Sequence, residues 1–186
     1  MSRTSWWPGW RRLLGGERLP DDFAGRLAAE ERVLAAAPVV TGGTLVVTTL
    51  GIWLPEGRRV GWHLVSKATW GDGVLTLVEA EPEDVAADVV LLRDLPARRL
   101  PLNEPGGVPA AVHKRVTSSI RFRHHRELPG GGAWFVRRGV PGTGGLVLQV
   151  RPDPGTDLAA ARRVAAEVAA RLRQVERSSG LGSSGH

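Results

Sequence analysis

The sequence predicts an α+β fold with about seven strands, a helix between the fifth and sixth strands, and an amphipathic helix at the C-terminal end. Three observations support this fold class. Between residues 32 and 93, β-branched and aromatic residues recur in short runs separated by turns that contain glycine or proline. Two further runs of this kind follow residue 133. From residue 158 onward, apolar residues recur at spacings of three and four, which is the period of one helix face.

The N-terminal half of this fold is expected to be a short helix followed by five strands. The helix is predicted over Leu19–Glu31, because Asp21 or Asp22 can cap its first turn. The expected strands are Arg32–Val40, Thr44–Leu54, Arg58–Trp70, Val74–Ala80 and Val89–Arg93. Gly-Gly, Pro-Glu-Gly and Gly-Asp-Gly separate the first four of them, and a loop rich in acidic residues is expected before the fifth.

The C-terminal half is expected to begin with the inserted helix, predicted over Val108–Leu128, and to continue with a hairpin and a last helix. The hairpin strands are Trp134–Val140 and Leu146–Arg151. The last helix is predicted from Asp157 to Arg177, with Thr156 or Asp157 as its cap. Its apolar stripe consists of Leu158, Ala161, Ala165, Val168, Leu172 and Val175. A stripe of this kind predicts packing against a sheet.

The chain is expected to form one domain with a short extension at each end. Residues 1–18 are rich in tryptophan and arginine, and residues 178–186 form a Ser/Gly tail expected to be flexible. The single domain is therefore predicted over residues 19–177.

Four segments resemble the pattern of bacterial PH-like (pleckstrin-homology, GRAM-type) domains. They are Glu31–Leu34, Thr44–Thr48, Ile52–Leu54 and Val60–Lys67. The resemblance spans roughly residues 30–175 and implies an antiparallel barrel of about seven strands capped by the C-terminal helix. The chain departs from that pattern at Leu50-Gly51, where the family often has Arg-Leu, and in the helix between strands five and six. The resemblance implies a binding or scaffolding role and supplies no catalytic residues.

Composition narrows the possible chemistry. The formal charge is +6 and the isoelectric point is near 11.2. All but two of the 25 basic residues are arginine, the exceptions being Lys67 and Lys114. This bias is typical of a GC-rich bacterial genome, so clustering of charge is more informative than its total. The absence of cysteine excludes disulfides and thiol chemistry. With neither a secretory leader nor an apolar run of spanning length apparent in the sequence, a cytoplasmic location is expected.

The predicted helix 108–128 carries the most concentrated positive charge. Opposite its apolar stripe stand four basic residues, one histidine and one aromatic residue, namely Lys114, Arg115, Arg121, Phe122, His125 and Arg126. Guanidinium groups around an aromatic ring suit phosphate contacts combined with base stacking. A solvated helix face is the alternative.

The N-terminal segment offers a second candidate surface, formed by Trp6, Trp7, Trp10, Arg11 and Arg12. Tryptophan beside arginine is typical of interfacial contact with an anionic membrane. The same tryptophans could instead cover an edge of the barrel or dock a second copy of the chain.

The other notable residues predict structure rather than catalysis. Trp53, Trp62, Trp70 and Trp134 lie on expected strands and are predicted to fill the core, and His63 is expected on the outer face. No metal site, cofactor site or catalytic set is recognised. We therefore expect a non-catalytic adaptor that binds a partner protein or its own copy. Nucleic-acid binding through helix 108–128 and weak attachment to an anionic membrane are the alternatives.

Overall fold

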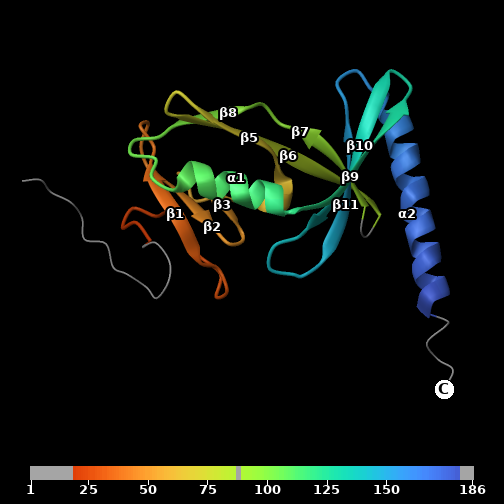
Figure 1. Cartoon of the computed structure of the whole chain (residues 1–186), viewed down its shortest axis with the longest axis horizontal. Coiled ribbons are helices and arrows are strands. Elements are labelled where there is room, and N and C mark those ends of the chain that lie inside the picture. The colour runs from red at the N-terminus through yellow and green to blue at the C-terminus, as the bar shows by residue number, and fades with distance from the viewer. Residues whose placement is uncertain (1–18, 87–88, 181–186) are drawn as a thin grey trace, which may run out of the picture. The chain divides into compact units, whose positions relative to one another are not determined.

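The protein is described by a computed structural model covering residues 19–86 and 89–180 (Figure 1). It is an α+β structure whose described residues form two compact units. Unit 1 consists of residues up to Glu79 together with Pro96–Ser118. Unit 2 consists of Ala80–Leu95 together with the residues from Ser119 onward. The chain therefore passes between the units three times, once in the middle of a strand.

Unit 1 combines two small antiparallel sheets with one helix. The first sheet contains, in order, β1 (Val33–Pro38), β2 (Thr44–Thr48), β3 (Gly51–Trp53) and β4 (Arg59–Gly61). A 3-10 turn, η1 (Trp62–Leu64), leads to β5 (Val65–Gly71). The first half of β6 (Val74–Ala86) pairs with β5 on one side and with β8 (Arg98–Pro101) on the other. A bridge between Val39 and Leu102 connects the two sheets.

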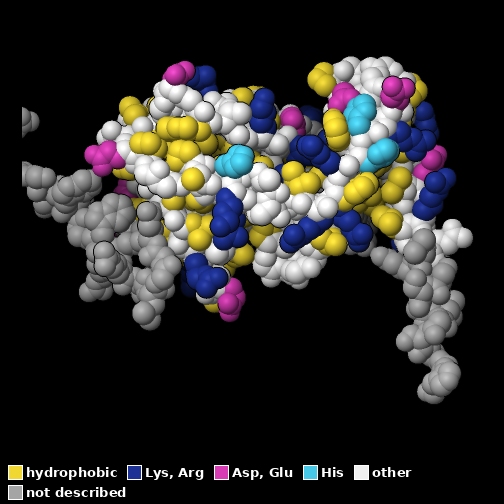
Figure 2. All heavy atoms as spheres, viewed as in Figure 1, with side chains coloured by type: hydrophobic (Ala, Val, Ile, Leu, Met, Phe, Trp, Pro, Cys, Tyr) yellow, Lys and Arg dark blue, Asp and Glu magenta, His cyan; other side chains and the backbone are white. Residues whose placement is uncertain are grey.

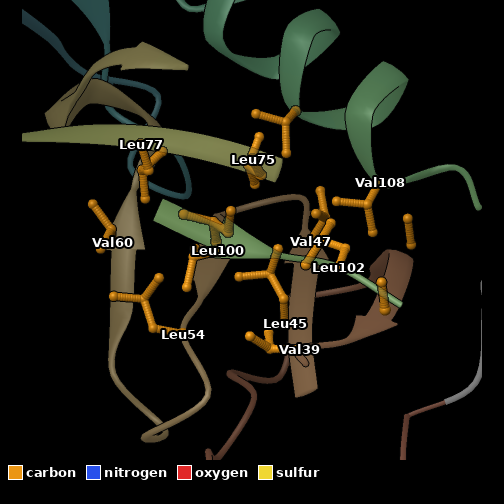
Figure 3. Close-up of a cluster of buried hydrophobic side chains, with 14 of the residues drawn as sticks. Val39, Leu45, Val47, Leu54, Val60, Leu75, Leu77, Leu100, Leu102 and Val108 are labelled. Carbon is orange, nitrogen blue, oxygen red and sulfur yellow. The ribbon is translucent and has the colours of Figure 1, made fainter. Parts of the chain in front are cut away.

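Helix α1 (Val108–Ser118) packs on these strands and completes the core of unit 1. It contacts β1, β2, β5 and η1. Val108 and Val112 are buried and lie one turn apart, so they project from the same face of the helix. Figure 3 shows Val108 directed toward Val47 and Leu102 in the cluster of aliphatic side chains from both sheets. The helix that packs on β1 and β2 is thus α1, whereas the C-terminal helix was expected to cap the barrel.

Residues 19–31 are not helical, although a helix was expected there. The predicted cap Asp22 instead accepts a hydrogen bond from the Thr44 hydroxyl at 2.9 Å. Leu19, Phe23 and Leu27 pack individually against a cluster that contains Trp53, and the Phe23 and Trp53 rings meet edge to face at 5.3 Å. Contacts with the first sheet therefore replace the helical hydrogen bonds.

A buried carboxylate, Glu31, joins this segment to the first sheet. Its oxygens accept hydrogen bonds from the Thr48 hydroxyl, from Trp53 Nε1 at 2.8 Å, from Arg59 Nη1 at 2.6 Å and from the backbone N–H of Ala28 at 3.1 Å. Burial alone raises the pKa of Glu31, but the hydrogen bonds from Thr48, Trp53 and the Ala28 backbone, together with the charge of Arg59, leave the pKa below its usual value. The carboxylate is consequently ionised and fully surrounded by donors, which is the arrangement of a structural anchor.

Unit 2 is built around a mixed sheet. The second half of β6 pairs with β7 (Val89–Asp94), and the order continues through β11 (Leu146–Pro152) and β10 (Gly131–Gly139) to β9 (Ile120–Leu128). All of these pairs are antiparallel except β7 with β11, which are parallel. The expected hairpin of β10 and β11 is confirmed, with Phe135 opposite Val150.

Helix α2 (Leu158–Gly180) packs against β7 and β11, which confirms the expected C-terminal helix. Asp157 caps it by accepting the N–H groups of Ala159 and Ala160, at 2.8 and 3.3 Å. The buried face consists mainly of alanine. Ala161, Ala165 and Ala169 share one buried cluster with sheet residues Val89, Leu91, Phe135 and Val150. Leu158 and Leu172 are exposed, so the predicted stripe was wrong at these two positions. Small side chains are buried here because they let the helix backbone approach the sheet closely.

Several other boundaries differ from the predicted ones. The expected strand 58–70 divides into β4, η1 and β5. The expected acidic loop is largely strand, since β6 runs to Ala86 with Glu81 opposite Arg93. Its acidic side chains pair with arginines, Glu79 with Arg58 at 2.7 Å and Glu83 with Arg162 at 2.7 Å. α2 extends three residues into the segment that was expected to be a flexible tail.

Two of the four tryptophans predicted to lie in the core are buried. Trp53 and Trp62 are buried as expected, and the indole N–H of Trp62 donates to the carbonyl of Thr48 at 3.0 Å. Trp70 and Trp134 are 39% and 40% exposed, so they are not core residues. His63 lies in η1, half-buried, instead of on the outer face of a strand.

The alanine face of α2 leads to a stability prediction. Ala165 is fully buried between α2 and the sheet, so Ala165→Leu should overpack this contact and lower the free energy of unfolding by about 1–3 kcal/mol. The matched variant Leu172→Ala, on the exposed side, should change it by less than about 1 kcal/mol. Alanine and leucine are both good helix formers, so helix propensity contributes little to either change in stability. Denaturant melts test the pair, and a larger loss for Leu172→Ala would contradict the assigned face.

The Glu31 anchor leads to a prediction that depends on pH. At pH 7 Glu31→Gln should lower the free energy of unfolding by about 2 kcal/mol, because a neutral amide replaces a charged acceptor. A carboxyl whose pKa is lowered on folding stabilises the protein above its unfolded value, 4.5, and loses this effect as the pH falls through the folded value. The difference in the free energy of unfolding between Glu31→Gln and the unsubstituted protein should therefore become smaller at acidic pH. The neighbouring Glu30 is exposed and provides the control, because Glu30→Gln should change the free energy of unfolding at pH 7 by less than about 0.5 kcal/mol.

Candidate binding surface on strands β9 and β10

The structure separates the six residues predicted to share one basic helix face. Lys114 and Arg115 lie on α1 in unit 1. Arg121, Phe122, His125 and Arg126 lie on β9 in unit 2. The helix ends at Ser118, and from Ile120 onward the chain pairs with β10. A helix continued past Ile120 would have placed Arg123, His124 and Glu127 on its apolar stripe. The expected continuous helix 108–128 was therefore wrong after Ser118.

Strand β9 is an edge strand with unusually high exposure. Within the part of the chain that the structure describes, β10 is the only strand hydrogen-bonded to it. All seven residues from Arg121 to Glu127 are exposed. Pairing with β10 runs from Leu128 opposite Gly131 to Phe122 opposite Arg137, with an irregularity beside Arg138. One side of β9 thus has no strand partner among the described residues.

The register assigns the side chains of β9 to two faces of the sheet. Phe122, His124 and Arg126 are opposite Arg137, Phe135 and Ala133, on the face where Phe135 contacts the α2 cluster. Arg123 and His125 are opposite Val136 and Trp134, on the other face. Cations therefore occur on both faces of the strand, and Phe122 is the largest apolar side chain on it, 58% exposed.

Trp134 forms the centre of a small exposed cluster on the second face. The His125 ring lies 4.9 Å from the Trp134 ring at an angle of 58°, and the Arg123 guanidinium lies 5.9 Å from it. Asp153 Oδ2 is 2.7 Å from His125 Nε2. Because an ionised carboxylate only accepts, Nε2 is the donor. The cluster holds an aromatic ring, a cation and an imidazole in fixed positions.

The hairpin of β9 and β10 is strongly basic. Residues 120–139 contain five arginines and one glutamate. Arg138 is buried, and burial together with the charge of Arg151 lowers its pKa to about 10. Burial also lowers the pKa of Arg151, whereas Asp94, at 3.5 Å, opposes that shift. A guanidinium with a pKa of about 10 stays charged at neutral pH, so Arg138 adds to the positive field.

Figure 2 shows the character of the side of unit 2 that it displays. Over β9, β10 and β11, Lys and Arg side chains (dark blue) and His side chains (cyan) lie among hydrophobic ones (yellow). Positive and apolar side chains thus lie side by side on this surface.

The remaining chemistry on the described residues is sparse. Across residues 19–86 and 89–180, no group of three His, Cys, Asp or Glu side chains is arranged to hold a metal ion. No helix in the same residues has the length and apolar character needed to cross a bilayer. The tryptophan- and arginine-rich segment with Trp6, Trp7, Trp10, Arg11 and Arg12 lies outside the described residues.

Comparison with protein-family models, with curated proteins and with solved structures found no match to this chain. Sequence reasoning assigned Trp134 to the core and did not single out Asp153. The alternation of Ile120 and Phe122 with Arg121 and Arg123 was the one local signal that could have revealed β9.

Removing the exposed charges of β9 should leave the fold intact. Arg121→Gln, Arg123→Gln and Arg126→Gln should each change the free energy of unfolding by less than about 0.5 kcal/mol, because exposed charges contribute little. Thermal melts of the three variants test this. A loss of several degrees in Tm for Arg121→Gln or Arg126→Gln would show that these side chains support the sheet. Arg123→Gln also loses the contact with Trp134, so its loss of stability should be the largest of the three.

Proposed function

We propose that the protein is a non-catalytic adaptor whose unit 1 is a PH-like barrel and whose basic hairpin β9–β10 binds an acidic protein partner. The barrel assignment is supported by the order of elements in unit 1. Four antiparallel strands, β1 to β4, are followed by three strands, β5, β6 and β8, and then by α1 on their core. In this proposal α1 is the capping helix, and the residues of unit 2 are additions to the PH-like pattern.

The observation that carries the binding function is the exposure of β9. Seven consecutive residues with both faces accessible, three arginines among them, form a surface with no covering element among the described residues. Long exposed edge strands favour unwanted pairing, and natural proteins shorten them, cover them or place charges on them, as the arginines of β9 do. Charge does not account for the exposed Phe122 and Trp134, which a partner covering the hairpin would bury.

A protein partner fits this surface better than a nucleic acid does. The Trp134 ring already has Arg123 and His125 against it, at 5.9 and 4.9 Å, which limits its use as a stacking platform. Exposed Trp and Arg together are typical of the centres of protein interfaces. Binding of the cationic surface to nucleic acid is the alternative that the experiment distinguishes.

Photo-crosslinking in the native host tests the proposal. A benzophenone amino acid at Phe122, on β9, should yield a discrete adduct with a protein, and the adduct should be destroyed by protease and resist nuclease. The same amino acid at Ala166, exposed on α2, is the matched control and should yield none. A nuclease-sensitive adduct would assign the surface to nucleic acid. Equal labelling at both positions, or at neither, would remove β9 as the binding surface.

A further inference from the structure

The proposed function leaves open how a partner contacts β9, and the backbone of this strand supplies an answer. The outer edge of an edge strand presents alternating N–H donors and C=O acceptors. Only a group with the same alternation can satisfy both, and another extended peptide has it. Phosphate oxygens accept hydrogen bonds and cannot donate to the outward carbonyls. The edge itself therefore favours a polypeptide.

The side chains of β9 determine what kind of polypeptide fits. No carboxylate of the described residues forms an ion pair with Arg121, Arg123 or Arg126. Residues of an added strand lie directly opposite those of β9, about 4.5–5.5 Å away at Cβ, where opposite charges attract and like charges repel. Acidic residues are thus favoured opposite Arg123 on one face and opposite Arg126 on the other.

A second copy of β9 is a poorer occupant than an acidic strand. Each copy carries three arginines and one glutamate over Ile120–Leu128. Each strand therefore has two more positive than negative side chains, so pairing two copies brings like charges together. The glutamates are too few to pair with all of the arginines. The same charges that disfavour self-pairing select an acidic segment.

We infer that the outer edge of β9 accepts an acidic, extended segment of the partner protein as an added β-strand. The inference rests on the proposed adaptor function and adds the mode of recognition and the chemistry of the partner. In this mode, acidic side chains at alternate positions face Arg123. The intervening positions lie on the face that carries Phe122 and Arg126, where an apolar residue fits beside Phe122 and an acidic one beside Arg126.

Fluorescence anisotropy with a defined probe tests the mode. The probe is an end-capped, labelled heptapeptide that alternates glutamate with valine, titrated with the full chain at low salt, about 50 mM. Two comparison peptides separate the contributions. One has the same sequence with the central glutamate and an adjacent valine N-methylated, which interrupts hydrogen bonding along both edges and keeps the charge. The other is heptaglutamate, which has more charge and little tendency to form a strand.

The expected result is binding of the alternating peptide, weakened about tenfold or more by N-methylation and equally weak for heptaglutamate. Arg123→Glu should weaken binding by about tenfold or more. Arg163→Glu, the same charge change at an exposed position of α2, should alter it less than about twofold. Hydrogen exchange gives an independent readout, because the peptide should slow exchange of alternate amides along β9.

Several outcomes would overturn the inference. Equal affinity for the N-methylated peptide or for heptaglutamate would show attraction by charge alone. Tighter binding of a fifteen-nucleotide single-stranded oligothymidine that displaces the peptide would assign the edge to nucleic acid. Absence of binding together with a protein adduct at Phe122 would retain the adaptor function and reject strand addition. Absence of both would reject the adaptor function itself.

Discussion

The carboxylate of Glu31 attaches the non-helical segment before β1 to three neighbouring strands of the first sheet in unit 1. The segment before β1 lacks a helix, so its attachment depends on side chains. Glu31 connects it to β2 through Thr48, to β3 through Trp53 and to β4 through Arg59. The backbone carbonyl of Thr48 in turn accepts the N–H of Trp62, at the centre of the core. If the carboxylate is removed, an indole and a guanidinium lose their acceptor together.

Much of the fold could be predicted from the sequence because the relevant signals are local. Turn residues such as Gly42-Gly43 and Gly71-Asp72-Gly73 mark where strands end, and the period of α2 is visible in its own residues. Segment 19–31 was misassigned because the tertiary bond from Thr44 to Asp22 outweighs a local helix cap. The single domain over residues 19–177 stays a prediction, and the two compact units of the described residues are defined by contacts between distant segments.

The candidate surface was less predictable because it depends on which strands become neighbours. Arg121, Phe122, His125 and Arg126 were identified from composition, but their arrangement on a strand follows from pairing with β10. The exposure of Trp134 depends on that pairing and on the parallel contact of β11 with β7, between segments about sixty residues apart. No local pattern encodes such a contact. The arginines of β9 then have two physical roles, since they repel a second basic edge and attract an acidic one.

The chain passes between its two units three times, and this limits how recombination could separate the units. Neither unit is contiguous: unit 1 requires Pro96–Ser118 in addition to its first segment, and unit 2 requires Ala80–Leu95 in addition to its last. Strand β6 contributes one half to each unit. A single breakpoint therefore cannot separate the two units: a cut after Ser118 keeps unit 1 whole but leaves β7 and the second half of β6 with it. Exchange of unit 2 as one continuous segment would either lack those strands or bring Pro96–Ser118 of unit 1 with it.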